Sequence, residues 1–175
     1  MQASRHIVAL LLLIMASFIS NAQKFEWVNF FQGQNIQAPV SLGVDAAGNQ
    51  YASFYFKNEI KFKSITVSKN NYQSGLVLKQ DTEGKVLWYK FMEGIREDLY
   101  TLDSKFNSKG NLIVLVTAAG PSILVGSDTL KRNGSGTNFA FYLLEFNDTG
   151  KLINGNHLID GVFYSFNVGR IVASD

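Results

Sequence analysis

Short runs of aromatic and β-branched residues recur along most of the chain, with polar turns between them. They cover residues 26–31, 50–56, 76–78, 86–92, 112–117 and 140–146. Runs of this length and composition are typical of β-strands. The glycine pairs between them supply the positive φ that tight reversals need, and helix signals are weak. The pattern predicts an all-β fold built as an antiparallel meander.

The first 22 residues have a different pattern. Arg5 and His6 precede an apolar run from Ile7 to Ile19, and the small residues Ser20 and Ala22 stand at the −3 and −1 positions of a cleavage site. The apolar run is shorter than the roughly 20 residues that span a bilayer. We interpret residues 1–22 as a secretory signal peptide. We expect the mature chain, residues 23–175, to be secreted or held at the cell surface, with no membrane span after cleavage.

The mature chain contains an internal repeat. The spacing of Trp27 and Gly33 recurs in Trp88 and Gly94, and an Asx-x-x-Gly turn recurs at a similar offset. A further match sets residues 60–67 against residues 123–130, which share a Ser-x-Thr core. The residues that define the repeat are Trp27, Gly33, Asp45, Gly48, Asp81, Gly84, Trp88, Gly94, Asn107, Gly110 and Gly150. The matched positions lie 61 to 66 residues apart, so one period holds four or five short strands.

A period of this size predicts a propeller blade, since blades of four antiparallel strands arranged radially bury both faces against their neighbours. The runs 51–56 and 112–116 fit this arrangement because neither alternates cleanly between apolar and polar residues. We therefore expect residues 23–175 to form a partial β-propeller of about two and a half blades, each of about 60–66 residues.

These turns and strands resemble a known family. The Asp45-x-x-Gly48-Asn49 turn before a strand, the Ser64-x-Thr66 hairpin and the Asp81-x-x-Gly84-Lys85 turn before Trp88 are similar to the β-propeller repeats of secreted bacterial proteins, often labelled SBBP. The resemblance covers nearly all of residues 25–175. It departs where Asn107 and Asn147 replace Asp and where Asn154 replaces Trp. The resemblance implies a modular extracellular protein without a general catalytic activity.

The number of copies is too small for a closed ring, because a propeller needs at least about four blades to remove its open edges. Asp175 stands where a further Asx-x-x-Gly turn would open. We interpret the chain as an N-terminal fragment of a longer protein. The alternative is a partial propeller that associates with itself through open sheet edges or is completed by another chain.

Charge and cysteine content disfavour or exclude several classes of function. Sixteen Lys and Arg against fourteen Asp and Glu give a net charge of +2, which does not favour nucleic-acid binding. The absence of cysteine excludes disulfides, thiolate metal sites and a Cys nucleophile. Each Asp turn offers a single carboxylate, so we interpret the turns as capped structures and expect neither a metal nor a cofactor. His157 replaces Phe91 of the previous copy and is interpreted as an aromatic strand residue.

Two functions remain. The first is a non-catalytic module that binds a protein or glycan, or acts as a scaffold, at the cell surface. The second is an accessory or partial catalytic propeller of an extracellular hydrolase. In that case the acidic cluster after Gly94 would supply paired carboxylates such as Glu93 and Asp98. Trp27 and Trp88 are interpreted as core residues between blades, because they recur at a fixed strand position.

Overall fold

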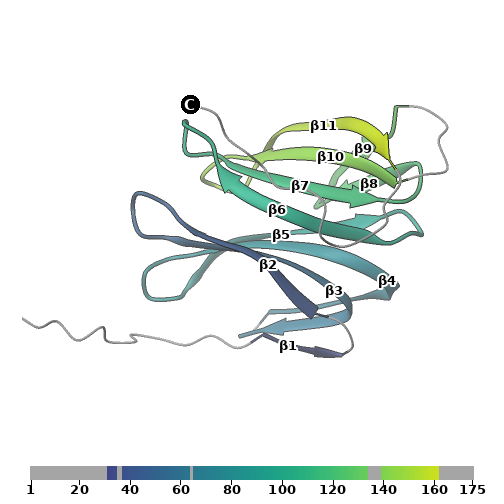
Figure 1. Cartoon of the computed structure of the whole chain (residues 1–175). Coiled ribbons are helices and arrows are strands. Elements are labelled where there is room, and N and C mark those ends of the chain that lie inside the picture. Colours follow the sequence, from purple (N-terminus) through teal and green to yellow (C-terminus); the bar gives the residue numbers. More distant parts are fainter. Residues whose placement is uncertain (1–30, 35–36, 64, 134–138, 162–175) are drawn as a thin grey trace, which may run out of the picture.

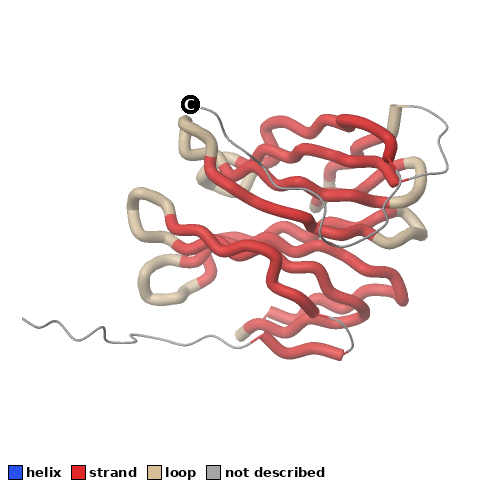
Figure 2. Tube along the Cα trace, in the orientation of Figure 1, coloured by secondary structure: helices blue, strands red, loops and turns tan. Residues whose placement is uncertain are grey.

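The structure is a computed structural model that describes residues 31–34, 37–63, 65–133 and 139–161. These residues form antiparallel strands joined by short turns (Figure 1, Figure 2). The strands are β1 (Phe31–Gln34), β2 (Gln37–Val44), β3 (Gln50–Phe62), β4 (Ile65–Gln80), β5 (Val86–Gly94), β6 (Leu99–Phe106), β7 (Leu112–Ala118), β8 (Ser122–Val125), β9 (Asp128–Lys131), β10 (Phe139–Phe146) and β11 (Leu152–Gly161). The all-β prediction is confirmed.

The strands belong to two sheets that lie face to face. The first sheet has the order β1-β3-β4-β5-β8-β9, with β2 paired to β3, and the second has the order β11-β10-β7-β6. Within the described ranges, no helix is long and apolar enough to cross a membrane.

The chain folds as two corresponding units. Unit 1 comprises residues 37–94 (β2 to β5), and unit 2 comprises residues 99–161 (β6 to β11). Their registers match, because Ala52 faces Leu78 in unit 1 and Val114 faces Leu144 in unit 2. One irregularity of the first strand matches as well, whereas β10 and β11 have a register shift between Phe141 and Tyr142 that β4 and β5 lack. The first strand of each unit has its bulge at the same repeat position, between residues 39 and 41 and between residues 101 and 103.

The short hairpin of each unit pairs with the strand that precedes the unit. Ile60 faces Gly33 of β1, and Ile123 faces Gly94 of β5. In unit 1 this hairpin is the far end of the long strands β3 and β4, whereas in unit 2 it is the separate pair β8 and β9.

The first sheet is therefore seven-stranded, where the sequence predicted separate blades of four strands. The two hairpin strands of unit 2 leave their own sheet and extend the sheet of unit 1, because the N–H and C=O groups of β8 find partners on β5 and those of β9 find partners on β8. The described sheets do not close into a ring.

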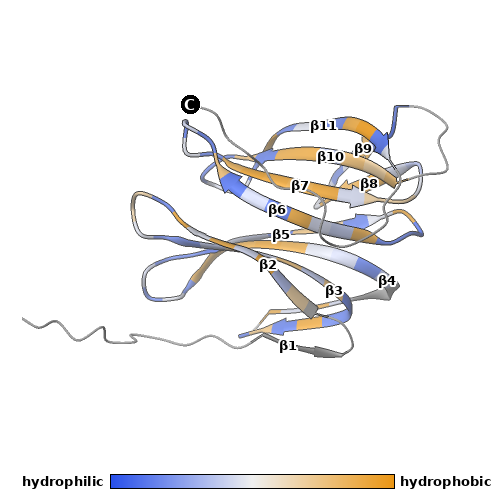
Figure 3. Ribbon diagram, in the orientation of Figure 1, coloured by the Kyte–Doolittle hydropathy of each residue, from blue (hydrophilic) through white to orange (hydrophobic). Residues whose placement is uncertain are grey.

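Two apolar cores lie on the two faces of the first sheet. The larger core fills the space between the sheets, where Val77 and Met92 of unit 1 pack against Val114, Tyr142 and Leu144 of unit 2. Figure 3 shows apolar positions along β7 and β10 of the second sheet. The smaller core lies on the other face of the first sheet and contains Ala52, Phe54, Phe56, Ile60, Phe62, Leu76 and Leu78. Strand β3 is thus buried on both faces, as the unbroken apolar run at residues 51–56 predicts.

Candidate functional site

Four hairpin turns with one shared geometry lie at the same end of the molecule (Figure 2). They span residues 45–49, 81–85, 107–111 and 147–151. In each turn the opening Asp or Asn accepts backbone N–H bonds at its side-chain oxygen from the residues two and four positions later, at 2.8–3.1 Å. The fourth residue is a glycine with φ between 75° and 83°, a conformation that a Cβ atom disfavours. The side chains of Asp45, Asp81, Asn107 and Asn147 are therefore used to build the turns.

A buried lysine connects two of these turns. The Lys79 side chain is 2% exposed, and its Nζ lies 3.2 Å from Asp45 Oδ2 of the first turn. It also donates to Asp148 Oδ1 of the last turn, which belongs to unit 2. The ring of Tyr51 lies under the same ammonium group, with its centroid 5.0 Å from Nζ. Lys79 therefore joins unit 1 to unit 2 through a buried charge that has two carboxylate partners.

The hydrogen bonds in this cluster favour the charged forms of both Lys79 and Asp45. Burial by itself lowers the pKa of Lys79, but hydrogen bonds with Asp148, Tyr51 and Asp45 outweigh that effect and raise this pKa above its ordinary value. Burial by itself raises the pKa of Asp45, but hydrogen bonds from Asn49 and Lys79 hold this pKa below its ordinary value. Lys79 therefore stays cationic and Asp45 anionic at neutral pH.

Unit 2 carries a different polar set at the same place. Glu145 stands at the repeat position of Lys79, and its Oε1 accepts from Asn107 Nδ2 at 2.9 Å and from Asn111 Nδ2 at 2.7 Å. Asn107 is the counterpart of Asp45. The pair Asp45 and Lys79 of unit 1 is thus replaced in unit 2 by the pair Asn107 and Glu145.

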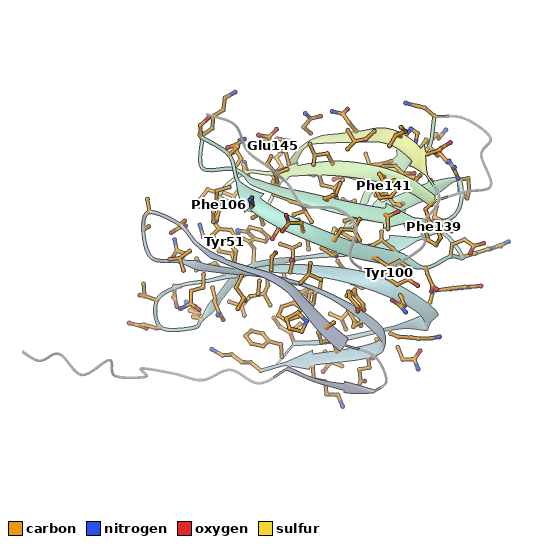
Figure 4. All side chains as sticks on the ribbon, viewed as in Figure 1. Tyr51, Tyr100, Phe106, Phe139, Phe141 and Glu145 are labelled. Atoms are coloured by element: carbon orange, nitrogen blue, oxygen red, sulfur yellow. The ribbon has the colours of Figure 1, made fainter. Side chains whose placement is uncertain are left out.

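Trp88 fastens unit 1 to the last turn of unit 2. Its Nε1–H donates to the Asp148 carbonyl at 2.9 Å, and its ring lies where a Cβ on Gly150 would stand, with the nearest ring atom at 2.6 Å. It also meets Tyr51 edge to face at a centroid distance of 5.8 Å. Figure 4 shows Tyr51 and Phe106 in the space between the two sheets. Trp27, the matched residue of the preceding copy, lies outside the described residues.

The remaining repeat residues occupy equivalent positions. Gly33 and Gly94 lie in β1 and β5, opposite the hairpins of units 1 and 2. Gly48, Gly84, Gly110 and Gly150 hold the positive-φ corners of the four turns.

Comparison with models of known protein families, with curated proteins and with solved structures gave no match.

A shallow groove runs beside β5. Its volume is about 560 Å³, and it is lined by Lys63, Ile65 and residues 85–89. Leu87 and Tyr89 are 48% and 44% exposed there. Because β8 pairs with β5 only at residues 92–94, no described strand pairs with the same edge at residues 86–90. The groove thus combines exposed apolar side chains, two lysines and a free strand edge.

The two acids proposed for hydrolysis, Glu93 and Asp98, have different surroundings. Asp98 accepts the backbone N–H of Gln73 at Oδ1, at 2.7 Å, and the Tyr100 hydroxyl at Oδ2, at 3.3 Å. Burial and the neighbouring Asp98 raise the pKa of Tyr100 to about 12, so its proton stays on the hydroxyl. Glu93 lines a smaller pocket of about 250 Å³ that does not include Asp98. Asp98 is used to hold β4 against the loop that follows β5.

A second polar cluster lies at the end of β11. His157 Nε2 lies 2.9 Å from Asp160 Oδ1, and Arg132 Nε donates to the same oxygen at 2.8 Å. The His157 ring packs on Tyr142 at a centroid distance of 5.5 Å, as expected of an aromatic strand residue. The hydrogen bond from Arg132 lowers the pKa of Asp160. The cluster fastens β11 to the end of the β8–β9 hairpin.

The sequence reading missed Lys79, Asp148 and Glu145 as partners. A signal for Lys79 was present, since it directly follows the apolar run 76–78 of a predicted strand. A lysine at such a place needs an anionic partner. The partner itself could not be found from the sequence, because Asp148 lies in a turn 69 positions away.

Proposed function

We propose that the chain is an exported, non-catalytic β-propeller repeat module that binds a protein or glycan at the cell surface and acts there as a scaffold. In this proposal the two units are successive blades, and the signal peptide at residues 1–22 directs export. The observation that carries the proposal is the groove beside β5, an exposed apolar and cationic surface on a repeat whose turn acids are consumed by structural bonds.

The repeat architecture supports the scaffold role. Two units with corresponding registers pack face to face, and the hairpin of unit 2 pairs with β5 of unit 1, so the two units form one packed body. Rigid bodies that carry adaptable side chains on strand edges are common as binding modules, and fold alone does not assign a reaction. The bonds that Asp98 makes to Gln73 and Tyr100 support the non-catalytic part of the proposal.

The binding test compares two tyrosines of equal exposure. Tyr89 in the groove is 44% exposed, and Tyr72 outside the groove is 43% exposed. The mature chain, Tyr89→Ala and Tyr72→Ala are each applied to a glycan array and to purified cell-envelope polysaccharide. Loss of an aromatic platform typically costs about 1–3 kcal/mol, so we expect Tyr89→Ala to weaken binding at least about fivefold.

Tyr72→Ala is expected to bind like the parent chain. Equal loss in both variants, or binding by neither the parent nor the variants to any glycan or envelope protein, would count against the groove as a binding site. Melting temperatures of all three proteins show whether a loss of binding comes from unfolding.

Export is tested separately. Expression in a bacterial host should yield a product in the periplasm or medium that begins at Gln23, as read by N-terminal sequencing. Retention of residues 1–22 on a cytoplasmic product would remove the export part of the proposal.

A further inference from the structure

The outer face of the second sheet carries an apolar surface. On β7 and β10, alternate residues such as Val114 and Leu144 point into the core between the sheets. Because side chains alternate along a strand, Ile113, Leu115 and Leu143 point the opposite way. These three residues are intermediate in exposure, and Ile159 of β11, on the same side, is 64% exposed.

In unit 1 the corresponding face is covered by unit 2. The residues of unit 1 at the same pairing positions are Tyr51, Ser53, Val77 and Met92, and all four are buried against unit 2. Met92 of β5 faces Gly75 of β4, and Ile159 of β11 faces Phe141 of β10, so Met92 and Ile159 hold the same pairing position. Met92 is 0% exposed and Ile159 is 64% exposed, so one repeat position is closed in unit 1 and open in unit 2.

We infer that the outer face of unit 2 is a docking surface for a further unit of the same repeat, packed on it as unit 2 packs on unit 1. The inference rests on the repeat architecture of the proposed function but not on export or on the groove beside β5. A second intact copy of this chain fits less well, because the face of unit 1 that would have to meet unit 2 already holds the buried residues Phe54, Phe56 and Leu76.

The charged residues beside the turns indicate which side chain the docked unit must carry there. Lys79 of unit 1 meets Asp148 from the last turn of unit 2. Glu145 holds the position of Lys79 in unit 2, and its Oε1 already accepts two amide hydrogen bonds on its own unit's turn. The last turn of the docked unit should therefore offer a cation or an N–H donor to Glu145, where unit 2 offers an acid to Lys79.

The shape of the face also differs from that of unit 1. Phe141 replaces Gly75, and a Cβ at Gly75 would stand 2.6 Å from Thr101 Oγ1 of the covering strand β6. Figure 4 labels Phe141 and Glu145, which both belong to β10. The first strand of the docked unit must carry a small residue opposite Phe141, whereas β6 carries Thr101 and Leu99 opposite Gly75.

The test uses a tandem chain. Asp175 stands in the sequence register of Asp45, so a second copy beginning at Ala46 is fused directly after Asp175. The chain contains no cysteine, so Ile159→Cys in the first copy is the only thiol. We expect maleimide to label this thiol at least about tenfold more slowly in the tandem than in the single chain. A Gly-Ser extension of equal length should leave the labelling rate unchanged.

Charge variants of the tandem test the chemistry. Thr82 precedes Asp148 by one period in the repeat, so Thr82 of the second copy should face Glu145 of the first. Thr82→Lys in that copy should raise the melting temperature of the tandem, and Thr82→Asp should lower it. The same substitutions in the single chain should show no such order.

A companion measurement on the single chain does not depend on the tandem folding. Leu143→Lys with Ile159→Lys should leave the single chain folded, since no described strand covers this face. The matched pair Val77→Lys with Met92→Lys should prevent folding. The inference is overturned if Leu143→Lys with Ile159→Lys unfolds the single chain, if the thiol in a cooperatively folded tandem stays as reactive as in the single chain, or if single chains protect it by dimerising. None of these outcomes concerns ligand binding, so this inference and the proposed function fail separately.

Discussion

Units 1 and 2 share a backbone but use it differently. The strand registers, the bulge in the first strand and the hairpin pairing recur at corresponding positions, while the residues at the most crowded places change. Gly75 becomes Phe141 and Lys79 becomes Glu145. The difference shows that turn and strand geometry are properties of the repeat, whereas face chemistry depends on what each unit packs against.

The largest expected effect comes from exchanging the face residues. Gly75→Phe places a ring where Thr101, Leu99 and Met92 already meet the glycine, so it should separate the sheets and cost at least about 3 kcal/mol. Phe141→Ala on the open face should cost only about 1 kcal/mol, because less apolar surface is lost. Denaturant unfolding of both variants measures the contrast, and similar costs would show that the two faces are equally closed.

The next effect separates two turn glycines. Gly110 and Gly150 have φ of 77° and 75°, but a Cβ meets nothing within 4 Å at Gly110 and meets the Trp88 ring at 2.6 Å at Gly150. Gly110→Ala should cost about 1 kcal/mol for the backbone alone, and Gly150→Ala about 3 kcal/mol because the indole must move as well. Thermal unfolding and tryptophan fluorescence report both. An unchanged fluorescence spectrum in Gly150→Ala would contradict the packing of Trp88 on that turn.

A smaller effect is expected from the polar pair. Lys79→Met keeps the length of the side chain but removes the cation between Asp45 and Asp148, which should cost about 2 kcal/mol. This cost is smaller than for a fully buried ion pair, because the Asp148 side chain is 77% exposed. Glu145→Gln keeps an acceptor for both amides and should cost about 0.5 kcal/mol. Chemical denaturation measures both variants, and a reversed order would show that Lys79 does not connect the units.

The smallest effect is a dependence on pH. The lowered pKa of Asp45 means that its stabilisation is present above its unfolded pKa of about 3.9 and is lost as pH falls through the folded pKa. The raised pKa of Lys79 means that its stabilisation is present below about pH 10.4 and is lost as pH rises through the folded value.

The measurement is the difference in melting temperature between the parent chain and Asp45→Asn. Asn keeps the oxygen that builds the turn, as Asn107 does in unit 2, so the variant loses mainly the charge. The difference should shrink between pH 6 and pH 2.5. A difference that stays constant over that range would show that the Asp45 charge does not contribute.

Turn chemistry and strand periodicity could be read from the sequence because they are local. An Asx residue four positions before the end of a glycine turn determines its own hydrogen bonds, and all four turns at residues 45–49, 81–85, 107–111 and 147–151 have one geometry. The pairing of the β8–β9 hairpin with β5 was not predicted, because strand pairing depends on which strand edge lies nearby in space. The Lys79 partnership with Asp148 was missed for the same reason, since it joins residues of two different units.

The pairing of each hairpin with the preceding strand has a consequence for how such a chain can lengthen or shorten. A recombination event that adds or removes one whole period brings the donor hairpin and the acceptor strand together again, so every backbone ladder is restored. Adding or removing a different number of residues separates a hairpin from the strand with which it pairs. Gene duplication in units of this length therefore preserves the backbone pairing, and later substitutions can adapt the faces of each copy to its neighbours.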